Sequence, residues 1–99
     1  ELFISIHLNA GSGSGVEAYT WKGKDLAIAN HICNNISKLD FKNRGVKDGS
    51  KLYVIKHTKM TAVLVECCFV DSQDDYLNYN YKSIARAIYN AIISVYGKE

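Results

Sequence analysis

Apolar residues recur along this chain with two different periods, which separates the expected strands from the expected helices. Residues 2–8 are apolar and β-branched apart from Ser5 and His7, and residues 16–21 alternate loosely, so both segments predict strands, the second more exposed than the first. Residues 51–56 predict a short strand. Residues 62–70 form a continuous apolar run, which is typical of a central strand of a parallel sheet.

Helical spacing appears in two other segments. Residues 24–39 carry one apolar stripe, with Asp25 in the expected first turn and Lys38 in the last, both favourable to the helix dipole. Residues 71–75 are polar and lead into a helical turn. The final segment predicts a second amphipathic helix, because one face collects the residues Ile84, Ile88, Ala91, Ile92 and Val95.

The remaining segments predict loops. Residues 11–15 alternate glycine and serine, a stretch too short for a domain linker, and residues 43–50 contain two glycines. Strands separated by helices, with one strand apolar on both faces, predict an α/β fold, layered as α/β/α with a mostly parallel sheet.

Length and charge limit the classes of protein to consider. The 99 residues fit part of a single domain, 1–99, and 47% of them are hydrophobic. The net charge of +2 comes from dispersed basic residues, so nucleic acid is not an expected partner, and the absence of an apolar run of about 20 residues argues against a membrane span. Because the chain opens within an expected strand and without methionine, we expect it to lack the N-terminal strands of its domain.

The three cysteines, Cys33, Cys67 and Cys68, are too few and too oddly placed to be a disulfide framework. Adjacent cysteines rarely bridge each other, because the ring that they close is strained. We expect buried, reduced thiols in a chain that folds in a reducing compartment.

Two ionisable residues end apolar runs. His7 follows residues 2–6, and Glu66 follows residues 62–65. Binding sites of open parallel sheets gather beyond the carboxyl ends of the strands, and a carboxylate after an apolar strand is costly without a partner or a role. Both residues are therefore candidates for chemistry, although Glu66 in a structural ion pair and His7 as a hydrogen-bonded core histidine remain alternatives.

Three sequence blocks carry a family resemblance. They are FISIHLNA at residues 3–10, NRGVK at 43–47 followed by LYVI at 52–55, and AVLVECCFVDS at 62–72. In this order they resemble the zinc-dependent N-acetylmuramoyl-L-alanine amidases of type 3, especially clostridial-type and phage endolysin catalytic domains. The resemblance implies that the chain is the C-terminal part of a single amidase catalytic domain.

The resemblance also implies a mechanism and a substrate. A zinc ion held in part by His7 lowers the pKa of a bound water, and Glu66 acts as the general base. The substrate is bacterial peptidoglycan, cleaved between N-acetylmuramic acid and L-alanine at the cell wall, either outside the cell or after release during phage lysis. Asn9 and Arg44 are candidate substrate contacts; the alternatives are a turn-forming asparagine and an exposed loop arginine.

The chain departs from the family in its ligands. The family supplies a further histidine and a ligand glutamate from segments before the first strand of this chain, whereas a catalytic zinc needs about three protein ligands. Among possible substitutes, His31 points away from its helix stripe, His57 borders a possible cleft, and Glu17 is expected to have a structural role. We expect an unpaired sheet edge that binds the missing N-terminal segment or a second copy of the chain.

Two rival functions remain at the level of sequence. One is a catalytically inactive fragment that binds the wall or regulates such an enzyme. The other is a cysteine hydrolase that uses Cys67 or Cys68 with His7 or His57, which requires an activated thiolate. The tyrosines near the last helix are expected to pack rather than to bind carbohydrate.

Overall fold

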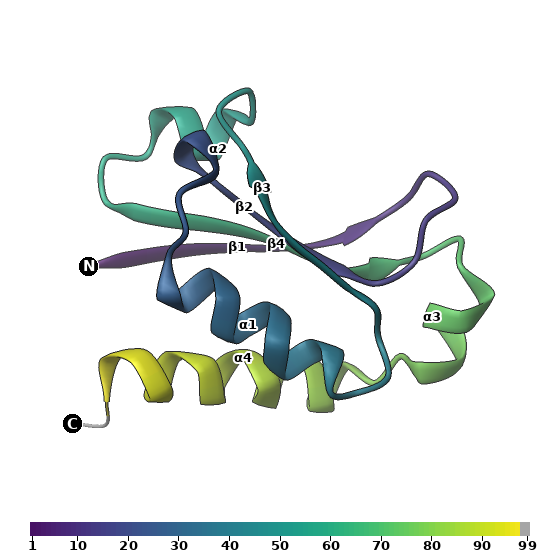
Figure 1. The fold of residues 1–99 in the computed structure, drawn as a ribbon. Coiled ribbons are helices and arrows are strands. Elements are labelled where there is room, and N and C mark those ends of the chain that lie inside the picture. The colour runs from purple at the N-terminus through teal and green to yellow at the C-terminus, as the bar shows by residue number, and fades with distance from the viewer. Residues whose placement is uncertain (98–99) are drawn as a thin grey trace.

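The computed structural model describes residues 1–97 and places one four-stranded sheet at the centre (Figure 1). The strands are β1 (Leu2–Asn9), β2 (Val16–Thr20), β3 (Asn43–Asp48) and β4 (Thr61–Phe69), and their order is β1-β4-β2-β3. β1 pairs with β4 and β2 with β3 in parallel, while β2 and β4 are antiparallel. The expected α/β fold is confirmed, with a sheet that is mixed in direction.

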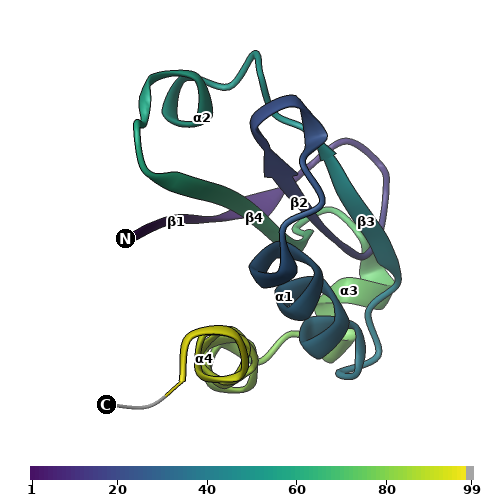
Figure 2. The ribbon, with the colours of Figure 1, turned by 60° about the vertical axis from the view of Figure 1, so that its left-hand side comes forward.

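Two helices cover one face of the sheet. α1 (Ala27–Ser37) and α4 (Tyr81–Tyr96) lie side by side there, and the short α2 (Tyr53–His57) lies on the opposite face (Figure 2). A 3-10 turn, η1 (Trp21–Gly23), follows β2, and α3 (Gln73–Asn78) follows β4. Within the described residues, no helix is both long and apolar enough to cross a membrane.

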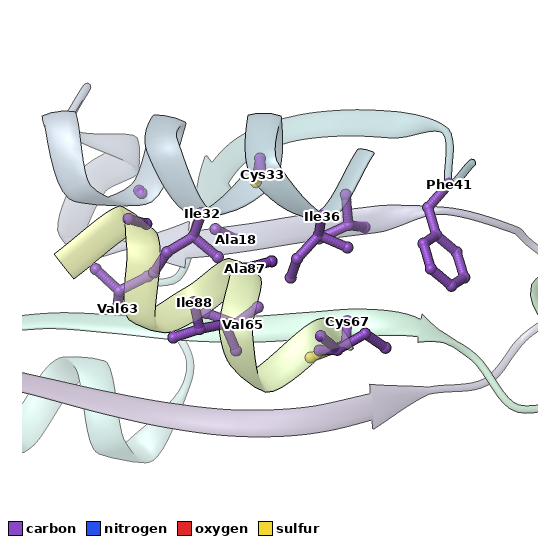
Figure 3. Close-up of a cluster of buried hydrophobic side chains, with 14 of the residues drawn as sticks. Ala18, Ile32, Cys33, Ile36, Phe41, Val63, Val65, Cys67, Ala87 and Ile88 are labelled. Atoms are coloured by element: carbon purple, nitrogen blue, oxygen red, sulfur yellow. The ribbon is translucent and has the colours of Figure 1, made fainter. Parts of the chain in front are cut away.

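β4 is apolar on both faces because both faces are covered. Val63, Val65 and Cys67 point into the main core, where they meet side chains of α1 and α4 such as Ile32 and Ile88 (Figure 3). The intervening residues Ala62 and Leu64 pack with Ile55 of α2 in a second, smaller cluster. Burial on both faces explains why the sequence shows no alternation here.

Two predictions for residues 43–57 are wrong. Residues 43–48, expected in a loop, form β3, and residues 51–56, expected as a strand, lie mostly in α2. β3 is an edge strand, so it carries polar and charged residues that conceal the apolar alternation. α2 has only five residues, which is too few to show a helical period against a strand period.

Other boundaries also differ from the prediction. β2 is more buried than expected, because it lies between β4 and β3. Helix α1 starts at Ala27, so Asp25 lies before the helix and accepts a hydrogen bond from Asn30 rather than capping the first turn. The final helix matches the prediction, with Ile84, Ile88 and Ala91 buried.

The glycine–serine loop is tied down at several points. Asp71 accepts hydrogen bonds from the backbone N–H groups of Gly11 and Ser12, and these bonds hold the pKa of the Asp71 carboxyl below its usual range. The buried carboxylate of Asp75 accepts from the N–H groups of Gly15 and Phe69, at 2.9 and 2.7 Å. The loop is therefore anchored to the end of β4 and to α3, and it fixes where β2 begins.

Replacing Gly15 with alanine is expected to destabilise the fold by roughly 2–5 kcal/mol. Gly15 has φ +109°, and a Cβ there would lie 2.2 Å from the carbonyl oxygen of Lys42, which itself accepts from the N–H of Val16. The measurement is the free energy of unfolding in urea. Gly11→Ala is a matched control, because Gly11 has φ +121° but open space around its Cβ position. Equal losses in the two variants would show that backbone strain, rather than the contact with Lys42, sets the effect.

Candidate active site

Three ionisable side chains form a row across three neighbouring strands. His7 of β1 is the register partner of Glu66 in β4, and Glu17 of β2 is the register partner of Glu66 on its other side. Side chains alternate between the faces of a sheet, and the neighbours of Glu66, Val65 and Cys67, point into the main core. The row therefore lies on the face that carries α2.

The row does not lie where strand ends were expected. β1 continues past His7 to Asn9, with an irregularity in pairing between these residues, and β4 continues past Glu66 to Phe69. Glu66 and His7 are brought together by cross-strand register within the sheet, not by a shared carboxyl edge.

Glu66 is held in an environment that disfavours its charge. Its Oε1 atom is buried and has no hydrogen-bond partner among the described residues. Burial raises the pKa of the Glu66 carboxyl, the charge of Glu17 raises it further, and the nearby His7 counteracts part of this effect. A buried oxygen without a partner costs folding free energy, so it is available for a proton, a water molecule or a cation.

The carboxylate of Glu17, in contrast, accepts hydrogen bonds at both oxygens. Only 3% of this residue is exposed, and its carboxylate accepts from Nε of Arg44 at 2.7 Å, from the Tyr19 hydroxyl, and from Asn9 Nδ2 at 3.1 Å. Burial raises the pKa of Glu17, but the hydrogen bonds from Arg44 and Tyr19 outweigh burial and lower it overall. The pKa of Tyr19 rises to about 12, through burial and its bond to Glu17. This network agrees with the structural role expected for Glu17.

The other candidate residues surround this row. The exposed ring of His7 has Nε2 2.7 Å from the Ser5 hydroxyl. Asn9 accepts from the N–H of Ala10 as well as donating to Glu17, and Arg44 also lies over the Phe69 ring, 5.0 Å from its centroid. Asn9 and Arg44 thus converge on Glu17 rather than on open solvent.

A pocket of about 370 Å³ opens beside Glu66. Tyr19, Asp48, Lys51 and Leu52 complete its lining. Tyr19, Asp48 and Lys51 were not expected near the site. Tyr19 lies two residues after Glu17, so a strand period starting from Glu17 would have placed it on the same face.

Residues 1–94 match the family of N-acetylmuramoyl-L-alanine amidases. This chain belongs to that family. It is 42% identical over 90 residues to an uncharacterized protein of Clostridium perfringens strain 13, a match covering 83% of this chain and 27% of that protein. It is 37% identical over 79 residues to the N-acetylmuramoyl-L-alanine amidase CwlM of Bacillus licheniformis, covering 76% of this chain and 31% of CwlM.

A solved structure supports the same assignment. The amidase chain resembles the catalytic domain of the CD27L endolysin, described as targeting Clostridia difficile, with a TM-score of 0.84 and 36% identity. The match covers 94% of this chain and 54% of that domain. The chain thus spans about half the length of the solved catalytic domain, and about a third or less of the two curated relatives.

The cysteines of the amidase chain lie in environments that do not favour a nucleophilic thiolate. All three are buried and free. Burial raises the pKa of Cys67 to about 12 and that of Cys68 to about 11. Both therefore remain thiols at neutral pH, which contradicts the rival reading as a cysteine hydrolase.

The remaining histidines lie on helices rather than on the strands of the row. His31 is exposed on α1, where its Nδ1 lies 2.9 Å from the carbonyl oxygen of Ala27, and His57 of α2 stacks against Tyr53 with 4.3 Å between ring centroids. Across residues 1–97, no group of three His, Cys, Asp or Glu side chains is arranged to hold a metal. The amidase family is generally zinc-dependent. Within this chain, the imidazole of His7 beside the unpartnered oxygen of Glu66 fits part of such a site and not the whole.

Proposed function

We propose that this chain supplies the general base and one metal ligand of a peptidoglycan amidase, which hydrolyses the bond between N-acetylmuramic acid and L-alanine at the bacterial cell wall. The observation that carries the proposal is the register pairing of His7 with Glu66, where the buried Oε1 of Glu66 has no partner among the described residues. CwlM, a named amidase, and the CD27L catalytic domain support this choice of reaction.

The chemistry divides between the chain and its cofactor. Bound zinc supplies polarisation of the scissile carbonyl and acidification of water. His7 is the proposed ligand, and it must be neutral to bind. Glu66 accepts the proton of the attacking water and delivers it to the departing alanine amine, as a general base and then a general acid.

The network around Glu17 supports the base rather than replacing it. Arg44 neutralises Glu17, which limits the repulsion between two carboxylates at adjacent positions. Only Nε of Arg44 bonds Glu17, so we propose that the rest of the guanidinium contacts a carboxylate of the stem peptide. We propose a similar substrate contact for Asn9, at the irregular end of β1.

The assay that tests this function follows the chemical groups that appear in purified cell walls when the chain acts together with the remaining family segments. Amidase activity releases free amino groups on L-alanine without releasing reducing sugar ends, and a chelator should abolish the release until zinc is restored. Reducing ends without free alanine would assign a glycosidase instead, and activity that resists chelation would remove the metal from the proposal.

His7→Ala is expected to lower both zinc content and hydrolysis, because a bound zinc loses one of about three protein ligands. Zinc per folded protein is measured by atomic absorption alongside the alanine assay, with the remaining family segments present. His31→Ala is the control, since His31 lies on the outer side of α1 and should change neither quantity. Full zinc occupancy in His7→Ala would move this histidine out of the coordination sphere.

A second candidate function is wall binding without catalysis. The observation that favours it is the lack of a three-ligand metal group within residues 1–97. Zinc content discriminates the two candidates: a chain that binds walls but retains no zinc in the presence of the remaining family segments is a binding module.

A further inference from the structure

A broad groove of about 930 Å³ runs between α1 and α4, on the opposite side of the sheet from the row of His7, Glu66 and Glu17. Three exposed cationic side chains, Lys38, Lys82 and Arg86, line it. None of them lies within ion-pair distance of a carboxylate among the described residues, where the only salt bridge joins Arg44 to Glu17.

The two helices that flank the groove, α1 and α4, carry no negatively charged side chain. The pocket beside Glu66, in contrast, combines Glu66 and Asp48 with Lys51, and Glu17 is paired with Arg44. The positive side chains of the groove therefore have no carboxylate on either of the two helices that form it. Such a groove attracts a polyanion.

Aromatic and polar side chains lie between these cations. Tyr81 is 66% exposed and Tyr89 49% exposed, which contradicts the expectation that these tyrosines pack in the core. The Nζ atom of Lys82 lies 5.9 Å from the centroid of the Tyr81 ring. Asn90 and Ser94 add an amide and a hydroxyl to the groove. Exposed rings beside cations and small polar groups suit a chain that alternates anionic groups with polyol or sugar units.

We propose that this groove binds a polyanionic, phosphodiester-linked polymer of the cell wall, separately from the peptide bond hydrolysed at Glu66. The inference rests on the proposed function in one respect, because that function places the protein at a wall. The bound polymer holds the enzyme on its insoluble substrate, and it raises the local concentration of the scissile bond without contributing a reacting group.

The test compares two variants with the same loss of charge. Lys38→Gln/Lys82→Gln/Arg86→Gln removes three positive charges from the groove, and Lys24→Gln/Lys56→Gln/Lys59→Gln removes three near α2 and the start of β4. Binding is measured by sedimentation with Gram-positive walls, before and after hydrofluoric acid removes phosphodiester polymers. The groove variant should bind untreated walls roughly ten-fold more weakly, and the control should bind nearly as the unaltered protein does. Acid treatment should abolish the difference.

Three outcomes overturn the proposal. Equal losses in both variants would mean that net charge alone drives binding. An undiminished difference on acid-treated walls would assign the groove to peptidoglycan itself. Tighter binding to double-stranded DNA than to the walls, at equal phosphate concentration, would assign it to nucleic acid.

A separate measurement keeps this result apart from the proposed function. Together with the remaining family segments, the groove variant and the unaltered protein should hydrolyse a small soluble muramoyl peptide equally, because the groove and Glu66 lie on opposite sides of the sheet. A failure of hydrolysis in all proteins, with the remaining family segments present, would refute the amidase proposal and leave the binding comparison intact. A selective loss of soluble-substrate turnover in the groove variant would refute the separation of the two sites.

Discussion

Glu66→Gln is expected to lower hydrolysis of the muramoyl–alanine bond by about 10²–10⁴-fold while leaving fold and zinc binding in place. Glutamine keeps the volume and polarity of the side chain within β4 but cannot accept a proton from water. The assay is the release of alanine amino groups by the protein together with the remaining family segments. Asp48→Asn is the control, because Asp48 lines the same pocket and its carboxylate is already bonded to Ser50.

The same substitution has an expected effect on stability, opposite in sign to its effect on rate. The pKa of Glu66 is raised in the folded chain, so the folded state holds its proton more tightly than the unfolded state does. Ionised Glu66 therefore destabilises the fold as pH rises through the ordinary carboxyl range and beyond it. In zinc-free protein at neutral pH, Glu66→Gln should unfold at an equal or higher urea concentration. In the catalytic assay, in contrast, near-normal hydrolysis of the muramoyl–alanine bond by Glu66→Gln would eliminate Glu66 as the general base.

The 99-residue chain by itself is expected to show no detectable hydrolysis of cell walls, even with added zinc. Its row offers one imidazole and one carboxylate with an unpartnered oxygen, since the other carboxylate, Glu17, is engaged by Arg44, Tyr19 and Asn9. A single imidazole binds zinc far more weakly than the several ligands of a tetrahedral site do.

Wall turbidity is the measurement, run with the chain alone and then with the N-terminal half of a family catalytic domain added. β1 is an edge strand of the described sheet and exposes Phe3, Ile6 and Leu8, so this edge is the expected contact with the added segment or with a second copy of the chain. Light scattering reports which of the two forms. Clear lysis by the monomeric chain would show that its zinc site uses other ligands, such as His31 or His57.

The pairing of His7 with Glu66 shows which features of the site can be predicted from the sequence alone. Both residues were identifiable because each interrupts an apolar strand. Burying an ionisable group there costs folding free energy unless the group has a partner or a functional role. Their adjacency depends on the register between β1 and β4, which are separated by 59 residues at Leu2 and Thr61, and no local pattern encodes that register. The strand ends expected at His7 and Glu66 are thus wrong, and only the register brings the two residues side by side.

Local patterns failed where tertiary context decided the outcome. β3 reads as a loop because an edge strand is allowed polar residues and a glycine at positive φ, here Gly45. The ion pair between Arg44 and Glu17 links β3 to β2. It could not be predicted, because the sequence does not show how these two strands are aligned. In contrast, the long α4 was predictable, because sixteen residues carry its apolar face through four turns.

The strand order has a consequence for biosynthesis. β1 leaves the ribosome before its partner in the described sheet, β4, which begins 59 residues later. At roughly 5–20 residues per second, translation leaves β1 without that partner for about 3–12 s. During this interval its apolar side chains are open to chaperones and to strands of neighbouring nascent chains. Polar substitutions at Ile6 or Leu8, which stay largely exposed in the folded chain, should therefore raise the yield of soluble protein more than they change its equilibrium stability.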